Sequence, residues 1–151
     1  MASAEKTVLV VDDSANDVDL LKWAFKGVGV RNPIQVVYSA DDAICYLAGE
    51  GRFKDRKTYP FPVLVLLDLK MPGTDGFEVL RWVRARESMK HLIIIVLTNS
   101  ELIEDIRRAY LLGANSFLTK PLPVDELNEM VRSFHNYWIV RNRTVPDSPA
   151  P

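Results

Sequence analysis

Short apolar stretches alternate with helix-periodic stretches along the whole chain. Most apolar stretches are uninterrupted and rich in β-branched residues, as expected of strands covered on both faces. They comprise Thr7–Val11, Ile34–Tyr38, Val63–Leu67, Leu92–Leu97 and Ser116–Leu118. The segments between them carry one-sided apolar stripes, namely Val18, Leu21, Phe25 and Val28; Ala43, Ile44 and Leu47; Phe77, Leu80 and Val83; Ile103, Ile106 and Tyr110; and Leu127, Val131, Phe134 and Trp138. This order predicts an α/β fold, a doubly wound parallel sheet of five strands with five helices on its two faces.

Turn and cap residues agree with this division. Ser14 and Ser39 stand where helix N-caps are needed, and Gly113 follows a predicted helix as a C-cap. Residues 49–62 are polar, contain two glycines and end in Pro-Phe-Pro, which indicates an enlarged loop. We therefore expect one domain over residues 1–143, followed by a disordered tail over 144–151.

Composition excludes several classes of protein. With 19 basic and 20 acidic residues, the chain has no positive field that would hold nucleic acid directly. The single cysteine, Cys45, argues against a disulfide-built secreted fold, and the apolar run near the N-terminus is too short for a signal peptide or a membrane span. We expect a cytoplasmic protein with no membrane partner.

Polar residues follow four of the five predicted strands. Asp12 and Asp13 follow the first strand, Asp68 the third, Thr98 the fourth and Lys120 the fifth. Because the carboxyl ends of parallel strands share one edge of the sheet, where ligands bind in such folds, these side chains are expected to converge.

Three converging carboxylates require a counter-charge, since one pair at about 4 Å costs roughly 4 kcal/mol at an effective dielectric near 20. Mg²⁺ suits oxygen ligands and leaves positions for water and phosphate, and Mn²⁺ or Ca²⁺ are candidate substitutes. Lys120 would add a point charge for a bound anion, and Thr98 a hydroxyl donor. Asp68, heading a turn shaped by Pro72, Gly73 and Gly76, is the predicted nucleophile toward phosphorus.

Four motifs in this order closely resemble the receiver domains of bacterial two-component response regulators. They are VLVVDDS from Val8, LLDLKMPGTDG from Leu66, VLTNS from Val96 and GANSFLTKP from Gly113. The resemblance covers roughly residues 6 to 140 and implies the flavodoxin-like receiver fold. It implies that the chain acts as a stand-alone signalling protein, not as an enzyme with an external substrate.

The resemblance also assigns roles. Asp12, Asp13, Asp68 and the backbone carbonyl of Lys70 would hold the metal, and Asp68 would take a phosphoryl group from a sensor histidine kinase. Thr98 would close on that group, Phe117 would turn inward, and the face of the fourth helix, fifth strand and fifth helix would change. A cis peptide bond before Pro121 is a further expectation of the family.

Within the family, the enlarged loop and the aromatic run 134–138 look most like small regulators paired with bacterial phytochromes. There, a homodimer through the last helix is expected, because exposed aromatic residues tend to mark interfaces. The same aromatic residues could instead cap the core.

Plainer explanations remain for single residues. Asp12 and Asp13 could be helix N-terminal acids favoured by the macrodipole, Thr98 an N-cap, and Phe117 a core residue. Two other functions compete. A metal-dependent phosphohydrolase would want an acid two residues after Asp68, where Lys70 stands, and a pseudo-receiver would bind partners without phosphorylation.

Overall fold

The computed structural model describes residues 6–121 and 123–145, and within them one parallel sheet carries the fold. Its strands lie in the order β2-β1-β3-β4-β5. They span Val8–Val11 (β1), Ile34–Val37 (β2), Leu64–Leu67 (β3), Ile93–Thr98 (β4) and Ser116–Thr119 (β5). The predicted five-stranded, doubly wound parallel sheet is confirmed, with strand ends within a residue or two of those expected from the sequence.

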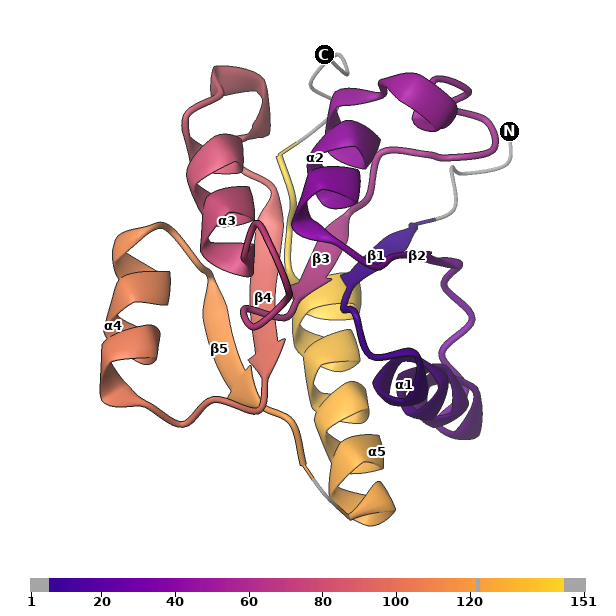
Figure 1. Cartoon of the computed structure of the whole chain (residues 1–151). Helices are drawn as coiled ribbons and strands as arrows, with labels where there is room; N and C mark the ends of the chain where they lie inside the picture. Colours follow the sequence, from indigo (N-terminus) through magenta and orange to yellow (C-terminus); the bar gives the residue numbers. More distant parts are fainter. Residues whose placement is uncertain (1–5, 122, 146–151) are drawn as a thin grey trace.

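In the described part of the chain, five α-helices cover the two faces of the sheet (Figure 1). They are α1 (Ala15–Gly27), α2 (Ala40–Ala48), α3 (Gly76–Arg84), α4 (Ile103–Leu111) and α5 (Val124–Phe134). Helices α1 and α5 bury one apolar core against the sheet, while α2, α3 and α4 pack on a second core on the other face. All four residues of β1 and of β3 are buried, because both strands are covered on both sides.

The register of the two central strands places the candidate acids side by side. Val11 of β1 pairs with Leu67 of β3, so the next residues, Asp12 and Asp68, leave the sheet together. The Asp68 N–H donates to the Val11 carbonyl at 2.9 Å, which extends this pairing to the residue that bears the carboxylate. Strand order, rather than sequence proximity, therefore brings the two acids into one site.

The predicted helix caps are confirmed at the start of α1 and α2. The Ser14 hydroxyl accepts from the Asp17 N–H, and the Ser39 hydroxyl accepts from the Asp42 N–H. Gly113, at φ 102°, ends the turn after α4, and its N–H donates to the Tyr110 carbonyl. These three residues set where the helices begin or end, as the sequence indicated.

Helix α4 presents a different face to the core from the one predicted. Ile103 and Tyr110 were expected to point inward but are 63% and 49% exposed, whereas Asp105 and Ala109 are buried. The predicted apolar stripe was therefore wrong for two of its three residues, since Ile106 is half-buried. The physical reason is that the Asp105 carboxylate pairs with the Lys70 ammonium and the Ser100 hydroxyl, which hold this side of the helix against the turns after β3 and β4.

The enlarged loop of residues 49–62 is ordered around aromatic side chains. It contains a 3₁₀ turn (Gly51–Phe53), and Phe53 and Tyr59 pack against the fully buried Tyr46 of α2. The Tyr46 hydroxyl donates to the Pro60 carbonyl at 2.7 Å, and burial raises the pKa of this phenol to about 12. Tyr46 thus anchors a segment that the sequence showed only as a polar insertion.

Helix α5 continues into a π-helix over His135–Arg141, which the apolar pattern did not predict. The Ile139 carbonyl in this segment accepts from the Lys6 ammonium at 3.2 Å, so the π-helix lies beside the start of β1.

Residues 146–151 of the predicted tail lie outside the described residues. Within the described ranges no peptide bond is cis, so the expected cis bond before Pro121 is not found. No described helix has the length and apolarity that a membrane crossing needs.

Candidate functional site

The carboxyl edge of the sheet holds a cluster of three acids. Asp12 and Asp13 follow β1 and Asp68 follows β3, and one carboxylate oxygen of each lies within 4.8 Å of the others. Asp12 and Asp68 are buried, while Asp13 is exposed. The Ser14 N–H donates to Asp12 Oδ1 at 2.9 Å, and the Lys70 N–H donates to Asp68 Oδ1 at 3.3 Å. These backbone bonds leave the second oxygen of each buried carboxylate pointing to a common centre.

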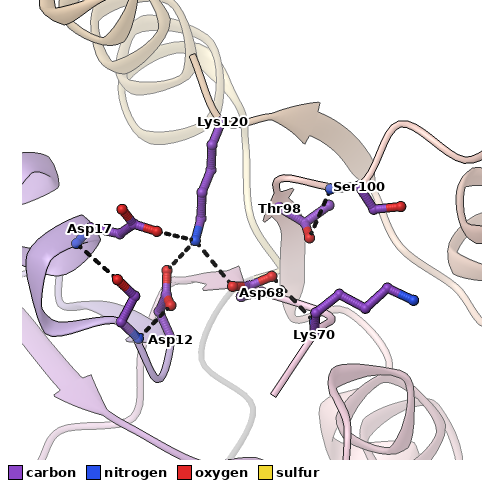
Figure 2. A network of polar contacts seen from close by, with 8 residues as sticks. Asp12, Asp17, Asp68, Lys70, Thr98, Ser100 and Lys120 are labelled. Atoms are coloured by element: carbon purple, nitrogen blue, oxygen red, sulfur yellow. Dashed lines mark hydrogen bonds and ion pairs between the residues drawn. The ribbon is translucent and has the colours of Figure 1, made fainter. Parts of the chain in front are cut away.

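Lys120 supplies the positive charge at that centre (Figure 2). Its ammonium lies 2.7 Å from Asp12 Oδ2, 3.0 Å from Asp68 Oδ2 and 2.8 Å from Asp17 Oδ2. The Lys120 N–H donates to the Thr98 carbonyl at 2.8 Å, which fixes the residue to the end of β4. The lysine side chain is only 11% exposed, so these ion pairs are well shielded from water.

Burial and pairing shift the pKa values of this group in predictable directions. Burial raises the pKa of the Asp12 carboxyl, and the hydrogen bonds from Lys120 and Ser14 offset this only in part. Burial alone would lower the pKa of Lys120, but the hydrogen bonds to Asp12 and Asp17 outweigh it and raise the pKa. The ammonium is therefore charged at neutral pH and stabilises its acidic neighbours.

A pocket opens beside this centre between α1, α5 and the sheet. Its polar wall is formed by Asp12, Asp17, Asp68 and Lys120, and its floor by apolar residues that include Leu66 and Leu97. The reactive groups thus lie at a boundary between solvent and core. That position weakens dielectric screening around the carboxylates without closing them off.

The donor set fits a hard divalent cation. All three grouped residues offer carboxylate oxygens, the ligand type that Mg²⁺ and Mn²⁺ prefer over thiolate or imidazole. Two of the carboxylates already share a cation in the form of the Lys120 ammonium. The carboxylate oxygens of Asp12 and Asp68 are therefore placed so that both can contact one cation.

Comparison with known families identifies the family of this chain. The family profile described as the response regulator receiver domain matches residues 8–132, a span that includes all the acids described above, Thr98 and Lys120. This chain belongs to that family. As a receiver domain it is a signalling protein of the class phosphorylated by histidine kinases.

Proteins similar to this receiver domain come from several signalling systems. A probable methanogenesis regulatory protein, FilR2 of Methanothrix harundinacea, is 35% identical over 147 residues, which cover 95% of this chain and 88% of FilR2. The crystal structure of response regulator RPA3017, in red light signalling of R. palustris, has a TM-score of 0.89 and 34% identity, covering 94% of this chain and 99% of that one.

Two further solved structures show relatives in modified or metal-bound states. The phosphorylated cyanobacterial phytochrome response regulator RcpA has a TM-score of 0.86 and 28% identity, covering 95% of this receiver domain and all of that chain. The Mn²⁺-bound form of response regulator Rcp1 has a TM-score of 0.82 and 28% identity, covering 93% and 99% of the two chains. The receiver domain is thus related to phytochrome response regulators.

The other predicted residues of the receiver domain lie around the acid cluster. Thr98 ends β4 and is fully buried, and its hydroxyl accepts from the Ser100 N–H at 3.4 Å. The N-cap of α4 is Leu102, so Thr98 does not cap that helix. Phe117 lies in β5, half-buried against the core beneath α2, α3 and α4. The Lys70 side chain extends away from Asp68, toward the side on which Ser100 lies (Figure 2). The structure thus brings the predicted acids together with Lys120 and the Lys70 backbone, whereas Phe117 packs against the core beside them.

Sequence reasoning missed Asp17, the third acid bound to Lys120. It lies in the first turn of α1, four residues after Asp13 and directly above its own cap residue, Ser14. The available signal was an acid three residues after the predicted cap Ser14, because that spacing places it in the first turn of the helix, next to the carboxyl end of the first strand. Asp17 joins α1 to the loop after β5 through the lysine.

Proposed function

We propose that this receiver domain accepts a phosphoryl group on Asp68 from a sensor histidine kinase. The observation that carries the proposal is the position of Asp68, whose carboxylate lies in one centre with Asp12, Asp13 and the Lys120 ammonium. Phosphorylation of the relative RcpA supports it.

In the proposed step, an Asp68 oxygen forms a bond to phosphorus as the bond to the kinase imidazole nitrogen breaks. The imidazole leaves with the electron pair of that bond and takes up a proton. Lys120, held at the end of β5, would neutralise negative charge on the phosphoryl oxygens, and the Thr98 hydroxyl would donate to one of them. Apolar residues below the carboxylates would lower the polarity around the reacting groups.

Asp12, Asp13, Asp68 and the Lys70 carbonyl would hold Mg²⁺, with Mn²⁺ or Ca²⁺ as substitutes. When bound, the ion would offset the charge of the acids and of the incoming phosphoryl group. The Lys70 backbone lies against Asp68 because its N–H donates to that carboxylate, which supports the inclusion of its carbonyl. The Mn²⁺-bound form of Rcp1 supports a site of this type.

Intact-mass analysis after incubation with Mg²⁺ and a small acyl phosphate tests the proposal. We expect one added phosphoryl group in the native protein and none in Asp68→Asn, because the amide cannot act as the nucleophile. Asp75→Asn is the matched control, since Asp75 caps α3 nearby and asparagine caps equally well.

The control variant should gain the same mass as the native protein. An unchanged native mass would contradict the proposal and favour a receiver fold that binds partners without modification. Persistence of the added mass in Asp68→Asn would place the phosphoryl group on another residue.

The output of the switch would be a change in the surface formed by α4, β5 and α5. Closure of Thr98 on the phosphoryl group and inward rotation of Phe117 would alter the packing beneath α4. A phytochrome-type kinase is the proposed input, because two of the similar structures belong to red light or phytochrome signalling.

A homodimer through the end of the last helix is also proposed. The aromatic run divides between core and surface, since Phe134 is buried, Trp138 is half-buried, and Tyr137 is 61% exposed. Tyr137 and Val140, which is 59% exposed, are the apolar side chains that the π-helix offers to a second copy.

Tyr137→Ser is expected to raise the dimer dissociation constant about tenfold, as loss of a central interface aromatic does. Sedimentation or light scattering over a concentration series would measure it. Trp23→Ser removes an aromatic residue that is 71% exposed on α1 and should leave self-association unchanged. A purely monomeric native protein, or equal effects of the two variants, would contradict this interface.

A further inference from the structure

Asp105 is a buried carboxylate that lies outside the acid cluster. It belongs to the first turn of α4, and the residue is only 8% exposed. The hydrogen bond from the Ser100 hydroxyl lowers the pKa of Asp105, and the Lys70 ammonium lowers it further. Burying a charged group is costly unless it is paired, so these two partners explain why this side of α4 lies inside the fold.

The partners of Asp105 come from the two turns that flank the candidate phosphoacceptor. The Lys70 ammonium lies 3.1 Å from Asp105 Oδ2, and Lys70 is two residues after Asp68. The Ser100 hydroxyl lies 2.5 Å from the same oxygen, and Ser100 is two residues after Thr98. One carboxylate of α4 therefore holds both turns.

Each of these turns is also bonded directly to a site side chain. The Lys70 N–H donates to Asp68 Oδ1, and the Ser100 N–H donates to the Thr98 hydroxyl. The Ser100 hydroxyl additionally accepts from the Leu102 N–H, the residue before α4. Contacts therefore run without a break from the Asp68 carboxylate and the Thr98 hydroxyl to the first turn of α4.

The inward position of Asp105 fixes which residues α4 exposes. With Asp105 and Ala109 facing the core, Leu102, Ile103, Tyr110 and Leu111 are between 49% and 87% exposed. Releasing Asp105 would free the helix to turn its apolar residues toward the core. The contacts of Asp105 with Lys70 and Ser100 thus oppose a rotation of α4 that would bury its exposed apolar side chains.

We propose that Asp105 is a positioning residue. Through its contacts with Lys70 and Ser100, it holds α4 in the position that the helix has before Asp68 is phosphorylated. The inference rests on the proposed phosphorylation of Asp68. A phosphoryl group there competes with Asp105 for the Lys70 ammonium and draws Thr98 away from the Ser100 N–H. Both changes weaken the hold on Asp105, so charge added at Asp68 releases α4.

Hydrogen exchange of the amides of residues 101–111 tests this coupling, first without any phosphoryl donor. Asp105→Asn keeps the size of the side chain and removes its charge. Lys70→Gln breaks the same ion pair by removing the charge of its exposed member. We expect each variant to raise exchange in α4 roughly tenfold, and the double variant no more than either single one, because all three break one interaction. Glu104→Gln is the control, as Glu104 lies in the same turn but is exposed.

The second arm adds Mg²⁺ and a small acyl phosphate, with phosphorylation followed by intact mass. Phosphorylation should raise α4 exchange in the native protein and in Glu104→Gln, and add little in Asp105→Asn or Lys70→Gln. Exchange in Asp105→Asn equal to that in Glu104→Gln would overturn the proposal, as would additive effects in the double variant. A native protein that gains no mass overturns the proposed phosphorylation instead, and the first arm still reports on the hold of Asp105 over α4.

Discussion

Replacing Lys120 with methionine is expected to lower the free energy of unfolding by about 3–5 kcal/mol at neutral pH in the absence of divalent metal. The variant keeps most of the side-chain volume but leaves Asp12, Asp17 and Asp68 without the cation that all three contact. Asp12 and Asp68 are buried, so water cannot replace the ammonium fully. Denaturant unfolding in the presence of a chelator would measure the loss.

Added Mg²⁺ should restore much of that stability, because the ion supplies charge where the ammonium was lost. Metal affinity, measured by calorimetry, should rise roughly tenfold or more, since Lys120 no longer competes for the same carboxylate oxygens. Phosphorylation by an acyl phosphate should nevertheless fall sharply. Lys22→Met is the control, because it makes the same charge change on the exposed side of α1. Weaker Mg²⁺ binding in Lys120→Met would show that the lysine does not compete with metal.

Gly76→Ala is the second change expected to have a large effect, although it adds a single methyl group. A Cβ at Gly76 would lie 2.9 Å from the Leu69 Cα and closer still to the Asp68 carbonyl oxygen. Neither is the end of a flexible side chain, so the backbone that carries the phosphoacceptor must move. We expect a loss of about 1–3 kcal/mol or more in unfolding free energy and slower phosphorylation.

Gly27→Ala provides the comparison for this prediction. A Cβ at Gly27 meets nothing within 4 Å, and the residue ends α1, where alanine favours the helix. Thermal unfolding should therefore leave Gly27→Ala equal to or slightly more stable than the native protein. Equal stability and equal phosphorylation rates for the two variants would show that the turn after β3 tolerates the methyl group.

The sequence was sufficient to predict the sheet because uninterrupted apolar strands and serine caps are local signals. Ser14 and Ser39 each act within three residues of their partners, and β1 and β3 are buried on both faces. The convergence of Asp12, Asp68 and Lys120 followed from parallel topology alone. The chemical roles of these residues stay predictions, which phosphorylation of Asp68 would test.

Features that depend on long-range polar contacts were not predictable from local patterns. The exposed side of α4 was wrongly assigned because Asp105 is paired with a residue 35 positions earlier. Asp17 was missed because its partner, Lys120, is 103 positions away. The π-helix carries apolar residues much as an α-helix would, and its spacing leaves little trace in the pattern.

The contact between Lys6 and the Ile139 carbonyl has a practical consequence for following this protein in solution. It places the start of β1 and the end of the C-terminal helix together at the amino edge of the sheet, across the molecule from Asp68. A fluorophore attached near the start of β1 would stand clear of an approaching kinase and would not replace a side chain of the proposed dimer contact. Energy transfer between such labels on two copies would then report assembly without obstructing the acceptor carboxylate.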